Sequence, residues 1–144
     1  MRTIKKNNAV HELGIHFVFC IKYRRQILTG AVEIATKHIL AQTCAEYAWK
    51  LQSLEIMPDH VHIFIQVGPM DRPIDIARTL KSISAVHLFT KFPNLKGRKF
   101  WGSGLWNDST YYGSVGKVDE EVITKYIANQ KNKKAGYSSQ GTSP

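Results

Sequence analysis

The chain has 144 residues, 43% of them hydrophobic, so we expect one domain with a substantial core rather than several domains. Twenty Lys and Arg against eleven Asp and Glu give a net charge of +9, which favours a polyanionic partner such as nucleic acid. A Lys-rich face in contact with water gives the same count, so charge alone leaves the partner open.

No segment resembles a membrane anchor or a signal peptide. Apolar runs fall short of the ~18 residues of a membrane span, and residues 1–10 lack the apolar stretch of a signal peptide. We therefore expect a cytoplasmic protein with no membrane partner. Residues 1–134 are predicted to form one domain, and residues 135–144, rich in Gly, Ser and Thr, a disordered tail.

The first half of the chain alternates extended and helical patterns. Residues 16–23 are a β-rich run, predicted as a central strand buried on both faces. Residues 30–48 favour a helix, and residues 52–57 an extended segment that stops at Pro58. The apolar face predicted for this helix comprises Val32, Ala35, Ile39 and Ala45.

Residues 60–67 alternate strictly between two faces of a predicted strand. One face carries His60, His62, Phe64 and Gln66. The other is apolar and predicted to pack inward, and it comprises Val61, Ile63, Ile65 and Val67. A helix is predicted over residues 73–89, with a buried face of Ile76, Leu80, Ile83, Val86 and Leu88.

The last third begins with a predicted strand over residues 109–115, interrupted by Gly113 and Gly116. A final helix over residues 119–134 is favoured by acidic residues at its start and lysines at its end. This order predicts an α+β fold: a ferredoxin-like (split βαβ) antiparallel sheet with helices on one face and an added C-terminal helix.

Two pairs of side chains suggest chemistry. His60 and His62 project from one strand face about 6–7 Å apart at the backbone, so their nitrogens can converge on one ion, although a polar strand face has the same pattern. Tyr126 and Gln130, four residues apart, share one face of the last helix, although Tyr126 also continues an apolar stripe typical of core. A phosphodiester that is bound to the metal could be attacked by the hydroxyl, and the reaction would be a phosphoryl transfer.

Three segments resemble the small single-tyrosine HUH transposases of bacterial and archaeal insertion sequences. They are Met57-Pro58-Asp59-His60-Val61-His62-Ile63, Leu105-Trp106, and Lys125-Tyr126-Ile127 with Gln130. The resemblance covers roughly residues 10–134. It implies that His60, His62 and Gln130 hold Mg²⁺ or Mn²⁺. Tyr126 would attack the scissile phosphate, leaving a 5′-phosphotyrosine and a free 3′-hydroxyl that later rejoins the strand.

The same resemblance implies single-stranded DNA with hairpins near the element ends as substrate. It also implies a homodimer in which the tyrosine helix of one subunit can complete the metal site of the other, which leaves action in cis or in trans open. Gly116 is a candidate hinge for this exchange, although a turn that leads into the helix accounts for the glycine equally well. His16 and His87 are given no ligand role, and Trp101 and Trp106 are expected in the core. The candidate DNA contacts are Lys22, Arg24, Arg25, Lys91, Lys96, Arg98 and Lys99.

Three alternatives remain at this point. A domesticated relative that processes chromosomal repeat hairpins, or a rolling-circle nicking enzyme, would share the chemistry. A non-catalytic RNA-recognition domain would share the fold and the charge, but should carry stacking aromatics on its central strands. Phe64 is the one aromatic on the histidine face of the predicted strand, which disfavours that alternative.

Overall fold

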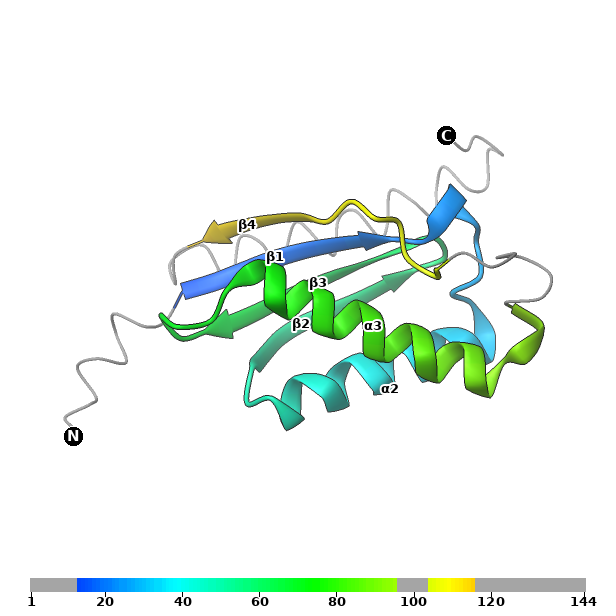
Figure 1. Ribbon diagram of the computed structural model, residues 1–144, viewed down its shortest axis with the longest axis horizontal. Helices are drawn as coiled ribbons and strands as arrows, with labels where there is room; N and C mark the ends of the chain where they lie inside the picture. The colour runs from blue at the N-terminus through cyan, green and yellow to red at the C-terminus, as the bar shows by residue number, and fades with distance from the viewer. Residues whose placement is uncertain (1–12, 96–103, 116–144) are drawn as a thin grey trace.

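The computed structural model describes residues 13–95 and 104–115. Within these ranges four strands and two long helices form two layers (Figure 1). A single 3-10 turn, η1 (Lys22–Arg24), follows the first strand. The long elements are β1 (Leu13–Cys20), α2 (Gly30–Glu46), β2 (Lys50–Met57), β3 (His60–Val67), α3 (Pro73–Lys91) and β4 (Tyr111–Val115).

The sheet has the order β2-β3-β1-β4, and every neighbouring pair is antiparallel. Helices α2 and α3 pack against each other on one side of this sheet (Figure 1). The element order and strand order together are those of a split βαβ, or ferredoxin-like, fold. This confirms the predicted α+β class. The predicted C-terminal helix, with Tyr126 and Gln130, lies outside the described residues, as does Gly116.

The core lies between the two central strands and the helices. Phe17 and Phe19 of β1 are fully buried. Val61, Ile63 and Ile65 of β3 are also fully buried, as predicted for the apolar face of residues 60–67. The opposite face of β3 is more buried than its alternating sequence suggests. His62 is 6% exposed and Phe64 is 1% exposed. On this face the ring of His62 packs against the rings of His16 and His60.

Several predicted element ends were wrong by a few residues. Strand β1 spans Leu13–Cys20 rather than 16–23, because the chain leaves the sheet at a turn where Tyr23 and Arg24 have φ values of 63° and 53°. Gly113 does not interrupt β4 but pairs with His16 of β1. Helix α2 ends at Glu46, β2 begins at Lys50, α3 continues to Lys91, and β4 begins at Tyr111.

The buried faces of the helices also differ from the apolar pattern. Leu80 and Leu88 of α3 are buried as predicted, but Val86 is 63% exposed, and Ala45 of α2 is exposed. Polar residues occupy buried positions in their place, including Ser84, whose hydroxyl donates to the carbonyl of Leu80 at 2.6 Å. A hydroxyl that bonds to the preceding helical turn can be buried at little cost. None of the described helices is long and apolar enough to cross a membrane.

Candidate active site at the histidine strand

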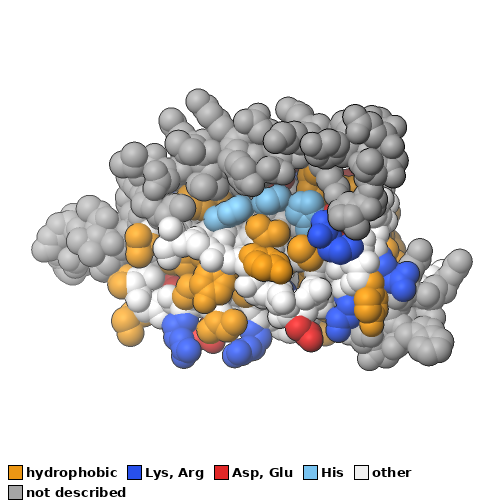
Figure 2. All heavy atoms as spheres, turned by 90° about the horizontal axis from the view of Figure 1, so that it is seen from above, with side chains coloured by type: hydrophobic (Ala, Val, Ile, Leu, Met, Phe, Trp, Pro, Cys, Tyr) orange, Lys and Arg blue, Asp and Glu red, His pale blue; other side chains and the backbone are white. Residues whose placement is uncertain are grey.

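His60 and His62 lie together on β3, as predicted. Their ring centroids are 5.0 Å apart and the rings meet at 74°. Both side chains point to the side of the sheet opposite α2 and α3, because the intervening Val61 belongs to the core beneath the helices. Figure 2 shows a row of histidine side chains on this face of the molecule.

Each of the two rings is held at one nitrogen by a protein partner. His60 donates from Nδ1 to Oδ1 of Asp59 at 2.7 Å. Nδ1 of His62 is hydrogen-bonded to Nε2 of His16 at 3.1 Å. No hydrogen bond to Nε2 of His60 or His62 occurs within residues 13–95 and 104–115. Metal-binding histidines commonly have this arrangement, in which the second nitrogen is fixed by a carboxylate or another acceptor.

His16 is a member of this cluster that the sequence did not identify. Its ring stacks on that of His62 with centroids 5.3 Å apart and an interplanar angle of 5°. In the β1–β3 register, Val18 lies opposite His62 and His16 opposite Phe64, so His16 is the diagonal neighbour of His62. The signal was a histidine within an apolar central strand, but the strand register that makes the contact cannot be read from the sequence.

Asp59 is the second residue whose role appears only in the structure. Its side chain is 4% exposed and lies between His60 and Arg24. Arg24 donates to Oδ2 of Asp59 from Nε at 3.1 Å, and its Nη2 lies 3.0 Å from the same oxygen. The carboxylate therefore orients the His60 ring and is itself held by a guanidinium.

Burial affects the pKa values of two rings in the cluster, His62 and His16. Burial, followed by the nearby His60 and His16, lowers the pKa of His62 from 6.5 to about 4. Burial also lowers the pKa of His16. His62 is therefore neutral at pH 7, which is the form that offers a lone pair to a metal ion.

The donor set fits a divalent metal with further ligands from elsewhere. Nε2 of His60 and Nε2 of His62 supply two imidazole nitrogens from one face of β3. Within residues 13–95 and 104–115, no three His, Cys, Asp or Glu side chains are grouped as a complete metal site. Gln130, the third ligand expected from the family resemblance, lies outside the described residues.

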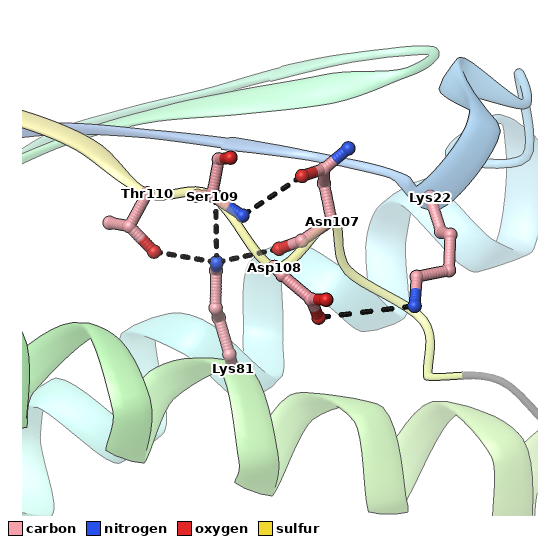
Figure 3. Close-up of polar contacts among 6 residues, drawn as sticks. All are labelled: Lys22, Lys81, Asn107, Asp108, Ser109 and Thr110. Carbon is pink, nitrogen blue, oxygen red and sulfur yellow. Dashed lines mark hydrogen bonds and ion pairs between the residues drawn. The ribbon is translucent and has the colours of Figure 1, made fainter.

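The segment leading into β4 is bound to the end of β1 and to α3. Leu105 and Trp106 are buried, which confirms the core position expected for Trp106, and Trp106 pairs with Ile21 as an isolated bridge. Trp101, also expected in the core, lies outside the described residues. The ammonium of Lys81 donates to the carbonyls of Asn107 and Ser109 at 2.8 and 3.0 Å and to the hydroxyl of Thr110 at 2.6 Å (Figure 3).

The four described candidate DNA contacts have different surroundings. Lys22 lies 3.9 Å from Asp108, and Arg24 is ion-paired with Asp59 beside the histidines. Arg25 packs over the ring of Tyr23. Lys91 is on α3, in the helical layer on the other side of the sheet from His60 and His62. The remaining candidates, Lys96, Arg98 and Lys99, lie outside the described residues.

A family model described as "Transposase IS200 like" matches residues 9–130, which is most of the chain. The chain belongs to the IS200-like transposase family. The match spans the histidine strand described above and the segments on both sides of it. The chain is thus a DNA transposase of the HUH class of single-strand nucleases, a family that generally uses a divalent metal.

Relatives of this transposase family agree with the assignment. The ISDra2 transposase TnpA of Deinococcus radiodurans is 36% identical over 129 residues, covering 90% of this chain and 91% of the relative. The transposase for insertion sequence element IS200 of Salmonella typhimurium is 31% identical over 119 residues, covering 80% and 74%. Both alignments cover at least 80% of this chain.

Solved structures support the same fold. The crystal structure of a transposase from Deinococcus radiodurans is 35% identical, with a TM-score of 0.69 over 83% of this chain and 92% of that one. A REP-associated tyrosine transposase bound to a REP hairpin is 15% identical, with a TM-score of 0.57 over 79% and 62%. At that identity the second likeness concerns the fold alone.

Proposed function

We propose that this transposase excises and inserts an insertion sequence as single-stranded DNA, nicking and rejoining the element ends through a phosphotyrosine at Tyr126. The observation that carries the proposal is the pair His60 and His62, held at Nδ1 by the buried Asp59 and the half-buried His16 respectively. No partner for either Nε2 lies among the residues that the structure describes. The relatives at 36% and 31% identity are transposases of insertion sequences, which favours this role over that of a domesticated repeat-processing enzyme.

The proposed metal is Mg²⁺ or Mn²⁺, held by His60, His62 and Gln130. A divalent ion bound there polarises the scissile phosphate and stabilises negative charge on the leaving oxygen. Asp59 and His16 keep the two imidazoles in position, so the rings need no reorganisation when DNA binds.

Tyr126 is the proposed nucleophile. Its phenol gives up a proton as the oxygen forms a bond to phosphorus. The bond to the 3′ oxygen breaks, and that oxygen takes up a proton and leaves as a hydroxyl. The downstream strand stays attached as a 5′-phosphotyrosine. Attack by another 3′-hydroxyl reverses the step and rejoins the strand, so the phosphodiester bond energy is kept and ATP is not required.

Recognition of the ends is proposed to use DNA hairpins, by analogy with the REP-associated tyrosine transposase, which binds a REP hairpin. The proposed assembly is a homodimer in which the tyrosine helix is exchanged about Gly116. Residues 1–134 are proposed to form the catalytic domain and residues 135–144 a tail. Basic residues outside the histidine cluster, among them Lys22 and Lys91, are proposed to contact the DNA backbone.

The test uses single-stranded DNA from the chain's own element end, labelled at the 3′ terminus and incubated with Mn²⁺ or Mg²⁺. We expect a metal-dependent covalent protein–DNA band on a denaturing gel, absent in Tyr126→Phe. Tyr111→Phe and Tyr112→Phe are matched controls, because both tyrosines are exposed on β4 and each loses the same hydroxyl. Both control variants should keep the band.

A wild-type protein that binds its end sequence but forms no covalent band would contradict the proposed chemistry. A band that persists in Tyr126→Phe and disappears in Tyr111→Phe or Tyr112→Phe would instead move the nucleophile to β4. Genome context adds an independent check, since a flanking element with subterminal hairpins supports a transposon and scattered palindromic repeats support domestication.

A further inference from the structure

The turn after β1 has a conformation that side chains disfavour. Tyr23 and Arg24 are consecutive residues with φ of 63° and 53°, in the left-handed region where non-glycine residues are strained. The turn is held by backbone bonds from Lys22 to the carbonyl of Leu105 at 2.9 Å and from Arg24 to that of Ile21 at 2.8 Å. The fold thus maintains an unfavourable backbone at this position.

The turn directs neighbouring side chains to opposite environments. Arg24 points inward to the buried carboxylate of Asp59. Tyr23 points outward, and 66% of its surface is exposed. The guanidinium carbon of Arg25 lies 5.5 Å from the centroid of the Tyr23 ring, so one ring face carries a cation and the other remains open to solvent.

The turn that carries this aromatic side chain is linked to the histidine cluster through Asp59. Asp59 binds Arg24, the residue next to Tyr23, and also binds His60. One carboxylate therefore separates the turn from a proposed metal ligand. Lys and Arg side chains adjoin one end of the histidine row in Figure 2, so this end of the site is positively charged.

An exposed ring backed by a guanidinium fits one class of ligand well. Nucleobases stack on aromatic rings, and their phosphates are attracted to the neighbouring Lys22 and Arg25, whereas bases within a duplex are already stacked on each other. The ligand that matches both the open ring face and the charge is therefore an unpaired base of single-stranded DNA. The net charge of +9 is consistent with this choice.

We infer that Tyr23, backed by Arg25, stacks an unpaired base beside the scissile phosphate and so positions the strand at the histidine cluster. This inference rests on the proposed function and adds a base-binding residue to it. The sequence pattern places Tyr23 at the end of a strand and suggests only its basic neighbours as DNA contacts.

The experiment uses full-length protein carrying Tyr126→Phe, so that no phosphotyrosine forms. Strands with 5-iododeoxyuridine at one position at a time around the cleavage site are irradiated with Mg²⁺ present, and the crosslinked peptide is identified by mass spectrometry. We expect a crosslink at Tyr23 for one such position, retained in Tyr23→Phe and lost in Tyr23→Ala. Affinity for the strand should fall about five- to a hundredfold in Tyr23→Ala.

Tyr47→Ala is the matched control, because Tyr47 is 50% exposed and its ring stacks on Trp49 at 4.8 Å, near the end of α2. It should leave the crosslink and the affinity unchanged. Crosslinks at other residues only, unchanged affinity in Tyr23→Ala, or an equal loss in Tyr47→Ala would overturn the inference. If the wild-type protein forms the covalent band but the Tyr23 crosslink is absent, only the stacking role is rejected. If the crosslink forms but the wild-type protein gives no covalent band, only the proposed cleavage is rejected.

Discussion

The buried carboxylate of Asp59 connects Arg24 to His60, so its removal should weaken metal binding at His60. We predict that Asp59→Ala weakens Mn²⁺ binding about 10- to 100-fold, because His60 loses the partner that fixes its orientation. Isothermal titration calorimetry with Mn²⁺ measures this directly. Asp108→Ala is the control, since that carboxylate is 97% exposed, and equal affinities of the two variants would contradict the prediction.

The lowered pKa of His62 has a consequence for stability without metal. In the folded protein the pKa is about 4, against 6.5 for an unperturbed histidine, so the unfolded chain binds more protons between these values. The contribution of His62 to the free energy of unfolding is present above pH 6.5 and is lost as the pH falls toward 4.

Urea denaturation in EDTA should therefore show decreasing stability over this range. The decrease should be smaller in His62→Asn, which has no ionisable group at this position. Identical pH profiles for the two proteins would show that His62 does not carry the effect.

At the level of single residues, the sequence was informative about type and spacing. His60 and His62 lie on one face because successive side chains of a strand alternate, which is a local property. His16 and Asp59 were missed as partners because their contacts depend on strand register and on a turn. The roles of Tyr126 and Gln130 remain predictions.

Helix α3 offers a comparison between two apolar residues of one element. Leu80 is fully buried and Val86 is 63% exposed, although the sequence placed both on the buried face. We predict that Leu80→Ala lowers the free energy of unfolding by about 2–5 kcal/mol. Val86→Ala should change it by less than about 0.5 kcal/mol. Urea denaturation monitored by circular dichroism measures both, and comparable losses would mean that Val86 is part of the core.

Element types were predicted well and element ends less well. Strand β3 and the start of α3 match the prediction because Pro58-Asp59 and Gly68-Pro69 are strong breakers on either side of β3, and Pro73 suits a first helical turn. The predicted end of β1 was wrong. Residues 21–23 have a β-rich composition, but the chain turns away from the strand here, with backbone hydrogen bonds to Leu105 and Asp59.

For the whole molecule, the net charge of +9 predicts salt-sensitive binding of single-stranded DNA. With about five phosphate contacts, affinity should fall about a hundredfold between roughly 50 and 200 mM salt. Fluorescence anisotropy with Tyr126→Phe and a labelled end sequence gives the slope of log affinity against log salt. A slope near zero would show that phosphate contacts do not dominate binding.

By itself the sequence determined the fold class, the histidine pair and the resemblance to the transposase family. Hydrophobic periodicity, turn residues and short motifs are local properties, so they can be recognised without knowing which distant segments are in contact. The tertiary structure alone decided that His16 holds His62, that Asp59 is shared by His60 and Arg24, and that Tyr23 is turned outward. These features arise where β1 pairs with β3 and the turn packs on the segment before β4, and such long-range pairings leave no periodic signal in the chain.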